Sequence, residues 1–313
     1  MAERAEVVVI GAGMAGLACA EALHRAGRRV VVLEKSRGLG GRCATRRRLG
    51  LTADHGSPYA VARDAQFSAA VAAWSQAGAA AAWPQAGTDH HTGQPGMSAL
   101  AKPMAVGLDV RLGERVEALD GAKGGWRLTI AGESADIEAE TLALAIPAAQ
   151  AHALLGTHAS AFPGLEQVEM EPCWTMIASA TAPAPDRVLI EGDGAPLKLA
   201  IRDSAKPGRA ASPETWVLHA GADWTRAHLE EAPDAVSQVL WQALSNALGQ
   251  PLPAPEPVMM HRWLYARVAR PLGQTHAYDP ALGIGLAGDW CQGPGVEAAW
   301  LSGRALAQTM LGS

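Results

Sequence analysis

Three glycines near the N-terminus have the spacing of a dinucleotide-binding turn. Gly11, Gly13 and Gly16 follow directly after an apolar run at residues 7–10. Gly11 permits a tight turn, Gly13 leaves room for a pyrophosphate beside the backbone, and Gly16 lets a helix pack closely against the strand. The free N–H groups at the start of that helix would face the phosphates with a partial positive charge. This stretch therefore predicts a diphosphate-binding site.

An acidic residue lies at the distance that such a site requires. Residues 30–33 form a second apolar run, and Glu34 follows at the carboxyl end of the predicted strand. A carboxylate there can accept hydrogen bonds from both hydroxyls of a ribose, and it would repel a 2′-phosphate. The pattern therefore favours a cofactor that contains adenosine diphosphate without the additional phosphate.

Aromatic side chains recur at alternate positions in the last quarter of the chain. His261, Trp263 and Tyr265 fall within residues 258–268, which we predict to be a strand, so their rings would project from one face of it. The chain has ten tryptophans and two phenylalanines, and such amphipathic rings suit the wall of a cavity that receives a planar molecule. Either this face is core or these rings line the active site. Two further side chains complete the set of candidate catalytic residues: Trp290 and Arg202.

Composition limits the classes of function. A chain of 313 residues with 49% hydrophobic residues can form two domains, and a net charge of −5 indicates no nucleic-acid surface. The basic run at residues 46–48 is a solvated loop or contributes a phosphate contact. The four cysteines show neither disulfide nor metal-site spacing. The first strand leaves no room for a secretory signal and no apolar stretch could span a bilayer. We expect a soluble cytoplasmic protein without nucleic-acid, membrane or metal partners.

The predicted elements divide the chain into two alternating parts. Near the end, residues 283–287 and 296–311 repeat the strand, glycine turn and helix of the start. Ser98 is a predicted N-cap of a short helix that ends near Gly107. The remaining predicted helices are residues 64–83, the segment from 148 to Leu155, and residues 235–248. The predicted strands between the termini are residues 110–112, 116–119, 126–130 and 135–138, which form a small antiparallel meander, and residues 142–146, 173–181, 187–191, 197–202 and 215–220.

These elements indicate an α/β protein with a discontinuous cofactor domain. We expect residues 1–60, 96–158 and 260–313 to form the cofactor domain. Residues 61–95 and 159–259 would form a substrate domain built on an antiparallel sheet, because prolines cluster there and short strand-like runs follow one another.

Four motifs together resemble the flavin amine oxidase and phytoene desaturase superfamily, whose members hold FAD. They are the glycine turn, Glu34 with Lys35, the Gly40-Gly41-Arg42 loop, and the Gly288-Asp289 pair. The resemblance implies a Rossmann-like FAD-binding domain of the glutathione-reductase type 2, with an inserted α+β substrate domain. No cysteine lies just before Gly288, where some members tether the flavin, so the resemblance implies non-covalent FAD.

The resemblance also implies roles for individual residues. The glycine turn would meet the FAD diphosphate, Glu34 the adenosine ribose, Arg42 the phosphates or the flavin edge, and Asp289 the ribityl chain or a phosphate. A helix N-terminus at residues 295–297 would face the flavin where negative charge collects on reduction. The implied FAD-binding residues are Gly11, Gly13, Ala15, Gly16, Glu34, Lys35, Gly41, Arg42, Val116, Asp289, Gly295, Val296 and Glu297.

Within the superfamily, four stretches are most similar to the bacterial renalases: residues 54–59, 96–101, 202–209 and 261–266. Renalases are FAD enzymes that oxidise isomers of NAD(P)H carrying the hydride at ring position 2 or 6. They pass the electrons to oxygen and give NAD(P)⁺ and hydrogen peroxide. The substrate would then be a nicotinamide dinucleotide isomer, together with oxygen. The alternatives are an amine or polyamine oxidase, a carotenoid- or porphyrin-type desaturase, and a flavin-binding protein without turnover.

Overall fold

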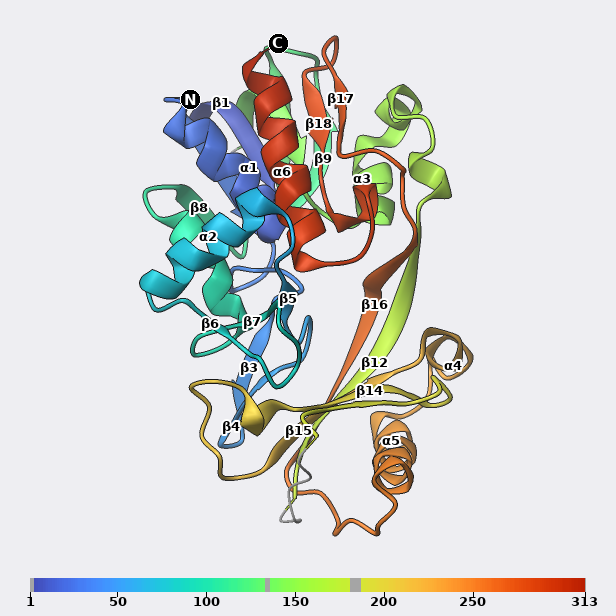
Figure 1. Ribbon diagram of the computed structural model, residues 1–313. Coiled ribbons are helices and arrows are strands. Elements are labelled where there is room, and N and C mark those ends of the chain that lie inside the picture. The colour runs from blue at the N-terminus through green and yellow to red at the C-terminus, as the bar shows by residue number, and fades with distance from the viewer. Residues whose placement is uncertain (1–2, 133–135, 181–186, 313) are drawn as a thin grey trace.

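The computed structural model describes residues 3–132, 136–180 and 187–312. Two large sheets dominate it, one of eight strands and one of five, and two small sheets lie beside them (Figure 1). The predicted strands at residues 135–138 and 173–181 each include a residue outside the described ranges. In the part of the chain that the structure describes, no helix is both long enough and apolar enough to cross a membrane.

The larger sheet has a parallel centre. Its main path follows the order β17 (Ala277–Asp279), β18 (Ile284–Leu286), β11 (Ile137–Leu144), β1 (Glu3–Ile10), β2 (Val30–Glu34) and β8 (Asp109–Leu112). The strands of a parallel sheet that is covered on both faces read as continuous apolar runs, which explains why residues 7–10 and 30–33 were predictable. Figure 1 shows the first and last helices, α1 (Met14–Arg25) and α6 (Val296–Leu311), side by side against this sheet.

Two predictions about the meander are wrong. The strand at residues 110–112 is β8, which pairs in parallel with β2 and not with the meander. The predicted strands at residues 135–138 and 142–146 are one strand, β11, which pairs in register with β1 over its length. Pairing with β1 keeps the segment between them, residues 139–141, extended. Of the strands in the predicted meander, β9 (Val116–Asp120), β10 (Trp126–Ile130) and β11 do pair in antiparallel fashion.

Two predicted helices differ in extent. Residues 97–105 form two short 3₁₀ segments, η1 (Met97–Ala101) and η2 (Pro103–Ala105), and Gly96, not Ser98, is the N-cap. Pro103 has no N–H to continue an α-helix. The helix predicted at 64–83 is α2 (Ala65–Gln76), capped by the Asp64 carboxylate, and Gly78 with a φ of +72° turns the chain into β6 (Ala80–Ala82).

The five-stranded sheet is antiparallel, with one face covered by a helix and the other face covered in part. Its order is β13 (Leu189–Glu191), β14 (Leu197–Arg202), β15 (Thr215–Ala220), β12 (Glu169–Ser179) and β16 (Val258–Arg270). Helix α5 (Pro233–Leu248) packs Val236 and Leu240 against Trp174 and Met176 on one face. On the other face, the hairpin of β3 (Thr45–Arg48) and β4 (Leu51–Asp54) covers one end. The other end of that face is left to line a cavity.

The remaining elements are short. They are β5 (Ala60–Val61), β7 (His90–Gly93), α3 (Ala148–Leu155), η3 (Gly156–Ala161), η4 (Leu165–Gln167), η5 (Asp203–Ala205), α4 (Ala222–Ala227) and η6 (Asp289–Cys291). Strands β5, β7 and β6 form a three-stranded sheet beside α2.

Close backbone approach fixes the packing of α1 on α6. A Cβ on Gly303 would lie 2.0 Å from the Ala15 carbonyl oxygen, and a Cβ on Gly16 would lie 1.9 Å from the Gly11 carbonyl oxygen. Both contacts are shorter than real Cβ contacts, so glycine is required at both positions. The two helices therefore set the position of the glycine turn relative to the end of the chain.

We predict that Gly303→Ala lowers the free energy of unfolding by about 1–3 kcal/mol, because the added methyl group must push the helices apart. Chemical denaturation of the variant measures this loss. Gly125→Ala is the matched control, since a Cβ there meets nothing within 4 Å. Equal stability of the two variants would contradict the prediction.

Candidate functional site

A cavity of about 2320 Å³ reaches from the glycine turn to the five-stranded sheet. Its wall includes Gly13 and Glu34 at one end and Thr175 and His219 at the other. The volume exceeds the usual range of small-molecule sites, about 300–1,000 Å³. One continuous space can therefore receive a dinucleotide cofactor and a second molecule together.

The glycine turn has the geometry that a diphosphate needs. The Gly11 N–H donates to the Leu33 carbonyl oxygen at 2.8 Å, which closes the turn between the first two parallel strands. A Cβ on Gly13 would meet nothing within 4 Å, so this position is open toward the cavity, and no side chain caps the N-terminus of α1. Ala15 also lines the cavity, whereas Gly16 serves the packing of the turn itself.

Glu34 is buried beneath this turn. Its Oε2 accepts the Ala12 N–H at 2.8 Å, and its Oε1 accepts the Ser36 N–H at 2.7 Å. The carboxylate therefore holds the glycine turn and also borders the cavity. Each carboxylate oxygen has a second lone pair, so two acceptors remain for hydroxyl groups of a ligand.

The second glycine loop closes against the first. The Gly40 N–H donates to the Ala12 carbonyl oxygen at 2.8 Å, and a Cβ on Gly41 would lie 3.3 Å from Gly13 Cα. Val116 and Lys35 border the cavity nearby, and Lys35 Nζ lies 3.2 Å from Gln150 Oε1.

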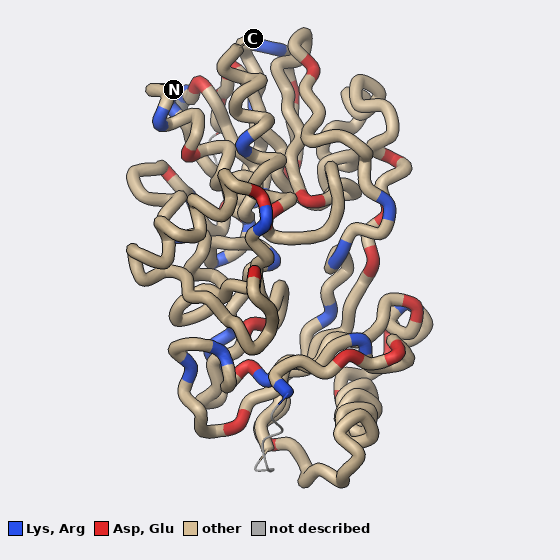
Figure 2. Tube along the Cα trace, viewed as in Figure 1, with Lys and Arg blue, Asp and Glu red and all other residues tan. Residues whose placement is uncertain are grey.

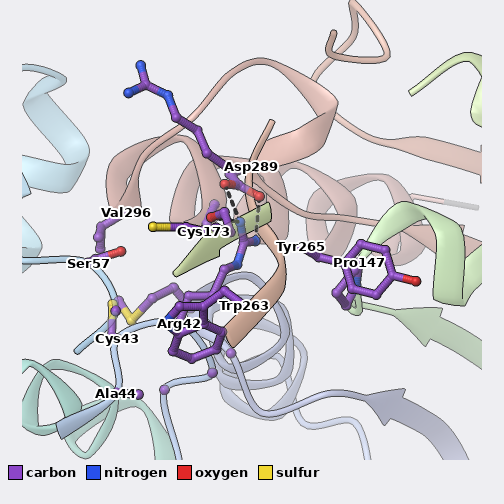
Figure 3. A pocket seen from close by; sticks show the side chains of 18 of the residues that line it. Arg42, Cys43, Ala44, Ser57, Pro147, Cys173, Trp263, Tyr265, Asp289 and Val296 are labelled. Atoms are coloured by element: carbon purple, nitrogen blue, oxygen red, sulfur yellow. Dashed lines mark hydrogen bonds and ion pairs between the residues drawn. The ribbon is translucent and has the colours of Figure 1, made fainter. Parts of the chain in front are cut away.

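Arg42 and Asp289 form a bidentate ion pair in the wall of the cavity (Figure 3). The two N–O distances are 2.8 and 2.6 Å, and Arg42 Nη1 also lies 3.3 Å from the Ala266 carbonyl oxygen of β16. The pair therefore joins the second glycine loop, η6 and β16. The resemblance implied separate cofactor contacts for these two residues, and the structure pairs them with each other.

The N-terminus of α6 borders the cavity at Gly295, Val296 and Glu297. No side chain caps this helix. The Glu297 carboxylate accepts the N–H groups of Arg63 and Asp64 at 2.7 and 2.8 Å, and so tethers the segment before α2. The helix N–H groups remain as donors with a partial positive charge.

An aromatic cluster of His55, His261 and Trp263 borders the sheet end of the cavity. The His55 and Trp263 rings stack with centroids 5.3 Å apart at 26°, and the His261 centroid lies 4.4 Å from that of Trp263. Trp263 Nε1 donates to the His55 carbonyl oxygen at 2.9 Å. Analysis of the sequence had not singled out His55, although it lies in the polar, turn-rich stretch 54–59.

The two histidines of the cluster are neutral at neutral pH. Burial lowers the pKa of His55 to about 3, and the Arg46 guanidinium adds to this effect. Burial and then Arg46 lower the pKa of His261 to about 4. Arg46 Nη2 lies 3.4 Å from His261 Nδ1. A guanidinium can only donate, so Nδ1 accepts and the ring proton of neutral His261 is on Nε2.

The other candidate catalytic residues lie apart from this cluster. Figure 3 shows Tyr265 pointing away from Trp263, toward the side of Pro147. Pairing between β12 and β16 shifts register between Glu171 and Cys173, so strict alternation along β16 fails there. Trp290 is fully buried and donates from Nε1 to the Ile146 carbonyl oxygen at 3.0 Å.

The structure does not bring Arg202 to the cavity. Its guanidinium Nη2 lies 3.2 Å from Glu214 Oε2, and it is not part of the cavity wall. Arg202 is the last residue of β14, and its side chain pairs with Glu214 in the segment before β15. We had predicted Arg202 as a candidate catalytic residue, but its guanidinium forms an ion pair within the protein.

Four buried charges support the hairpin that carries His55. Lys206 Nζ lies 2.8 Å from Asp54 Oδ2 and 2.6 Å from Asp203 Oδ1, and Arg209 also pairs with Asp54. Burial alone would raise the pKa of Asp54, but the charges of Lys206 and Arg209 hold it below its usual value. Asp54 directly precedes His55, so this cluster fixes the start of the loop that positions the aromatic rings.

A sequence match over most of the chain identifies the family. Residues 58–311 match the family described as flavin containing amine oxidoreductase, and residues 9–74 match an NAD(P)-binding Rossmann-like domain. The chain belongs to the flavin-containing amine oxidoreductase family. It is a flavin-dependent oxidoreductase, and FAD is its cofactor. The open glycine turn and the buried Glu34 carboxylate are the features that fit FAD.

Two curated proteins resemble this chain over a short stretch. A stretch of 57 residues is 49% identical to all-trans-retinol 13,14-reductase of Macaca fascicularis and of Homo sapiens. The stretch is 18% of this chain and 9% of the reductases' length. The likeness is therefore confined to a small part of either protein.

Solved structures share the fold at low identity. A putative protoporphyrinogen oxidase from Exiguobacterium sp. 255-15 aligns with a TM-score of 0.78 and 16% identity, covering all of both chains. A triple mutant of putrescine oxidase has a TM-score of 0.74 and 14% identity over all of both chains. Cyclohexylamine oxidase from Brevibacterium oxydans IH-35A has a TM-score of 0.72 and 13% identity over 98% of each. These similarities show the fold, which is mixed α/β.

We predict that Glu34→Ala weakens FAD binding on the order of tenfold or more, since it removes two acceptors next to the diphosphate turn. Equilibrium titration of apoprotein with FAD measures the affinity. Glu34→Gln is the control, because it keeps one acceptor oxygen and should bind with intermediate affinity. Unchanged affinity in Glu34→Ala would contradict this role.

The free energy of unfolding should decrease as the pH is lowered through the range in which a free histidine gains a proton. The folded pKa of His261 is about 4 and its ordinary value is 6.5, so the unfolded chain binds the proton first. The stability contributed by neutral His261 is complete above pH 6.5 and is lost as pH falls from there toward 4. We predict that His261→Gln loses less Tm than the wild type between pH 7 and pH 5. An identical loss would show that His261 is not held neutral.

Proposed function

We propose that this member of the family is a renalase-like oxidase of NAD(P)H isomers that carry the hydride at ring position 2 or 6. The products are NAD(P)⁺ and hydrogen peroxide. The hydride leaves the dihydropyridine ring, and oxygen with one proton takes up the two electrons. The observation that supports this proposal is the aromatic cluster of His55, His261 and Trp263, with Arg46 beside it.

The charge beside the aromatic cluster favours an anionic substrate over an amine. The two histidines are neutral, and the nearby Asp54 is buried and compensated by Lys206 and Arg209. Among the residues that the structure describes, no carboxylate pairs with Arg46, so its positive charge beside the rings is uncompensated. A protonated amine would meet a guanidinium there, whereas a nucleotide brings negative phosphates.

The cluster can also hold a planar ring in place. Trp263 is fixed on one side by its stack on His55 and by the hydrogen bond from its Nε1. FAD, when bound, accepts the hydride and passes the electrons to oxygen. The chain's own contribution is to hold the substrate ring flat at the site and to keep water away, since hydride transfer needs orientation more than acid or base groups.

We extend the proposal to the architecture. The cofactor domain is of the glutathione-reductase type 2 and comprises residues 1–60, 96–158 and 260–313, with residues 61–95 and 159–259 as the inserted substrate domain. The site residues proposed from the sequence keep their roles except as described above. The FAD is held without a covalent bond, so acid precipitation should leave no flavin on the protein.

An amine oxidase is the alternative. The cavity is also bordered by Glu171, Glu191 and Asp223. Glu171 and Asp223 share one partner, Arg226, whose single positive charge offsets one of the two carboxylates. Glu191 lies at the far strand, β13. The arrangement near the rings favours the dinucleotide.

The proposal predicts fast anaerobic bleaching of the flavin by the 2- and 6-dihydro isomers, measured by stopped-flow absorbance. Ordinary NADH, which carries its hydride at the para carbon, should react far more slowly. A panel of amines, including putrescine, is offered in parallel. If an amine bleaches the flavin readily and the isomers react no faster than NADH, the protein is an amine oxidase instead.

Trp263→Ala should slow bleaching by the isomers at least tenfold without loss of FAD, because the ring surface that orients the substrate is removed. The matched control is Trp224→Ala. Trp224 also stacks on a histidine, His228, with centroids 4.1 Å apart, but does not border the cavity. Equal rates in both variants would remove Trp263 from the site.

A further inference from the structure

The hairpin of β3 and β4 brings a basic side chain to the aromatic cluster. Arg46 and Arg47 both border the cavity, whereas the next residue, Arg48, does not. Figure 2 shows the basic residues of this hairpin gathered near the five-stranded sheet, away from the glycine turn in the upper domain. These arginines therefore lie at the substrate end of the cavity and not at the diphosphate end of the cofactor site.

Arg46 has unused hydrogen-bonding capacity. Among the described residues its hydrogen-bonding partner is His261 Nδ1, at 3.4 Å. A guanidinium carries five N–H donors in a planar fork, and its fork matches phosphate oxygens. At least three of its donors therefore remain for a ligand.

Within the described residues no carboxylate forms an ion pair with Arg46, and Asp54, which directly precedes His55, is already paired with Lys206 and Arg209. A cross-strand row runs over the cavity face of the five-stranded sheet: Glu191, Leu199, His219, Thr175 and His261. Glu191 is four strand steps from His261, about 19 Å at roughly 4.8 Å per step. The intervening His219 is neutral, because burial and then Lys206 lower its pKa to about 4.

The spacing matches a nucleotide. The imidazole of His261 lies between Arg46 and Trp263. Its centroid is 4.4 Å from that of the Trp263 ring, and its Nδ1 is 3.4 Å from Arg46 Nη2. In a nicotinamide nucleotide, one ribose separates the ring from the first phosphate. A ring held at Trp263 would place its phosphate within reach of Arg46.

We propose that Arg46 binds the phosphate next to the nicotinamide ribose of the substrate. This inference rests on the proposed function, which supplies the nicotinamide nucleotide. Arg46 selects phosphorylated nicotinamides over the free nucleoside, so it determines specificity without taking part in hydride transfer.

The test measures binding of three product-like ligands to the oxidised FAD-loaded enzyme by the change in flavin absorbance. They are NAD⁺, nicotinamide mononucleotide and nicotinamide riboside, which lacks the phosphate. The wild type should bind the mononucleotide about tenfold more tightly than the riboside, which is typical of one charge-assisted contact. Added salt should reduce this ratio.

Arg46→Gln keeps an N–H for His261 but removes the charge, so it should lose the preference for phosphate while binding the riboside as before. Arg46→Lys should restore part of the preference. Arg48→Gln is the matched control, from the same hairpin but outside the cavity wall, and should behave as the wild type.

Three outcomes would overturn the inference. If Arg46→Gln weakens mononucleotide and riboside equally, Arg46 acts through His261 and not on phosphate. If it changes neither, the subsite lies elsewhere, and in both cases the proposed function stands. If none of the ligands binds to the wild type, the proposed function fails together with the subsite.

Discussion

The buried carboxylate of Asp54 is the contact on which the substrate end of the cavity depends. One oxygen accepts from the Met97 N–H at 2.8 Å and from Thr45 Oγ1 at 2.7 Å, and the other meets Lys206 Nζ at 2.8 Å. It therefore joins the hairpin, the segment at η1 and the turn after β14. Removing one partner from such a buried cluster would leave an uncompensated charge at a cost of about 3–5 kcal/mol.

The consequences of this contact extend to the aromatic rings. His55 follows Asp54 directly, its ring stacks on Trp263, and its carbonyl oxygen accepts the Trp263 indole N–H. On the opposite side, the Arg42–Asp289 pair and the Arg42 contact to Ala266 hold β16 against the cofactor end. The cavity is thus framed by two ionic clusters, one buried beneath the hairpin and one between the glycine loop and η6. Both clusters position rings and backbone and leave the cavity itself open.

Local patterns predicted the cofactor end of the molecule well. The glycine turn, the helix at residues 296–311 and the strands at residues 7–10 and 30–33 each follow from short-range spacing or from continuous apolar runs. The position of β8 in the sheet could not be predicted, because the sequence of a four-residue strand does not indicate which strand it pairs with. Ser98 was a plausible cap, but Pro103 prevents the helix that it would have started.

The substrate end was harder to predict, because its contacts join distant residues. Asp54 and Lys206 are 152 positions apart, and the stretches that contain them stood out only through the resemblance to renalases. The sequence suggested a row of three rings on one strand, and the structure replaces one member with His55 from another segment because β16 loses its register beside Glu171. Arg202 was a candidate catalytic residue, but its guanidinium pairs with Glu214, in the connection before β15.

A crystal structure of the FAD-loaded protein with NAD⁺ would test most directly whether one cavity holds a flavin and a nicotinamide dinucleotide together. We predict that the nicotinamide ring lies flat against the flavin beside Trp263, with the phosphates directed toward the hairpin that carries Arg46. Density for NAD⁺ outside this cavity, or none at concentrations that saturate the protein, would contradict the assignment, most clearly if an amine occupied the aromatic cluster instead.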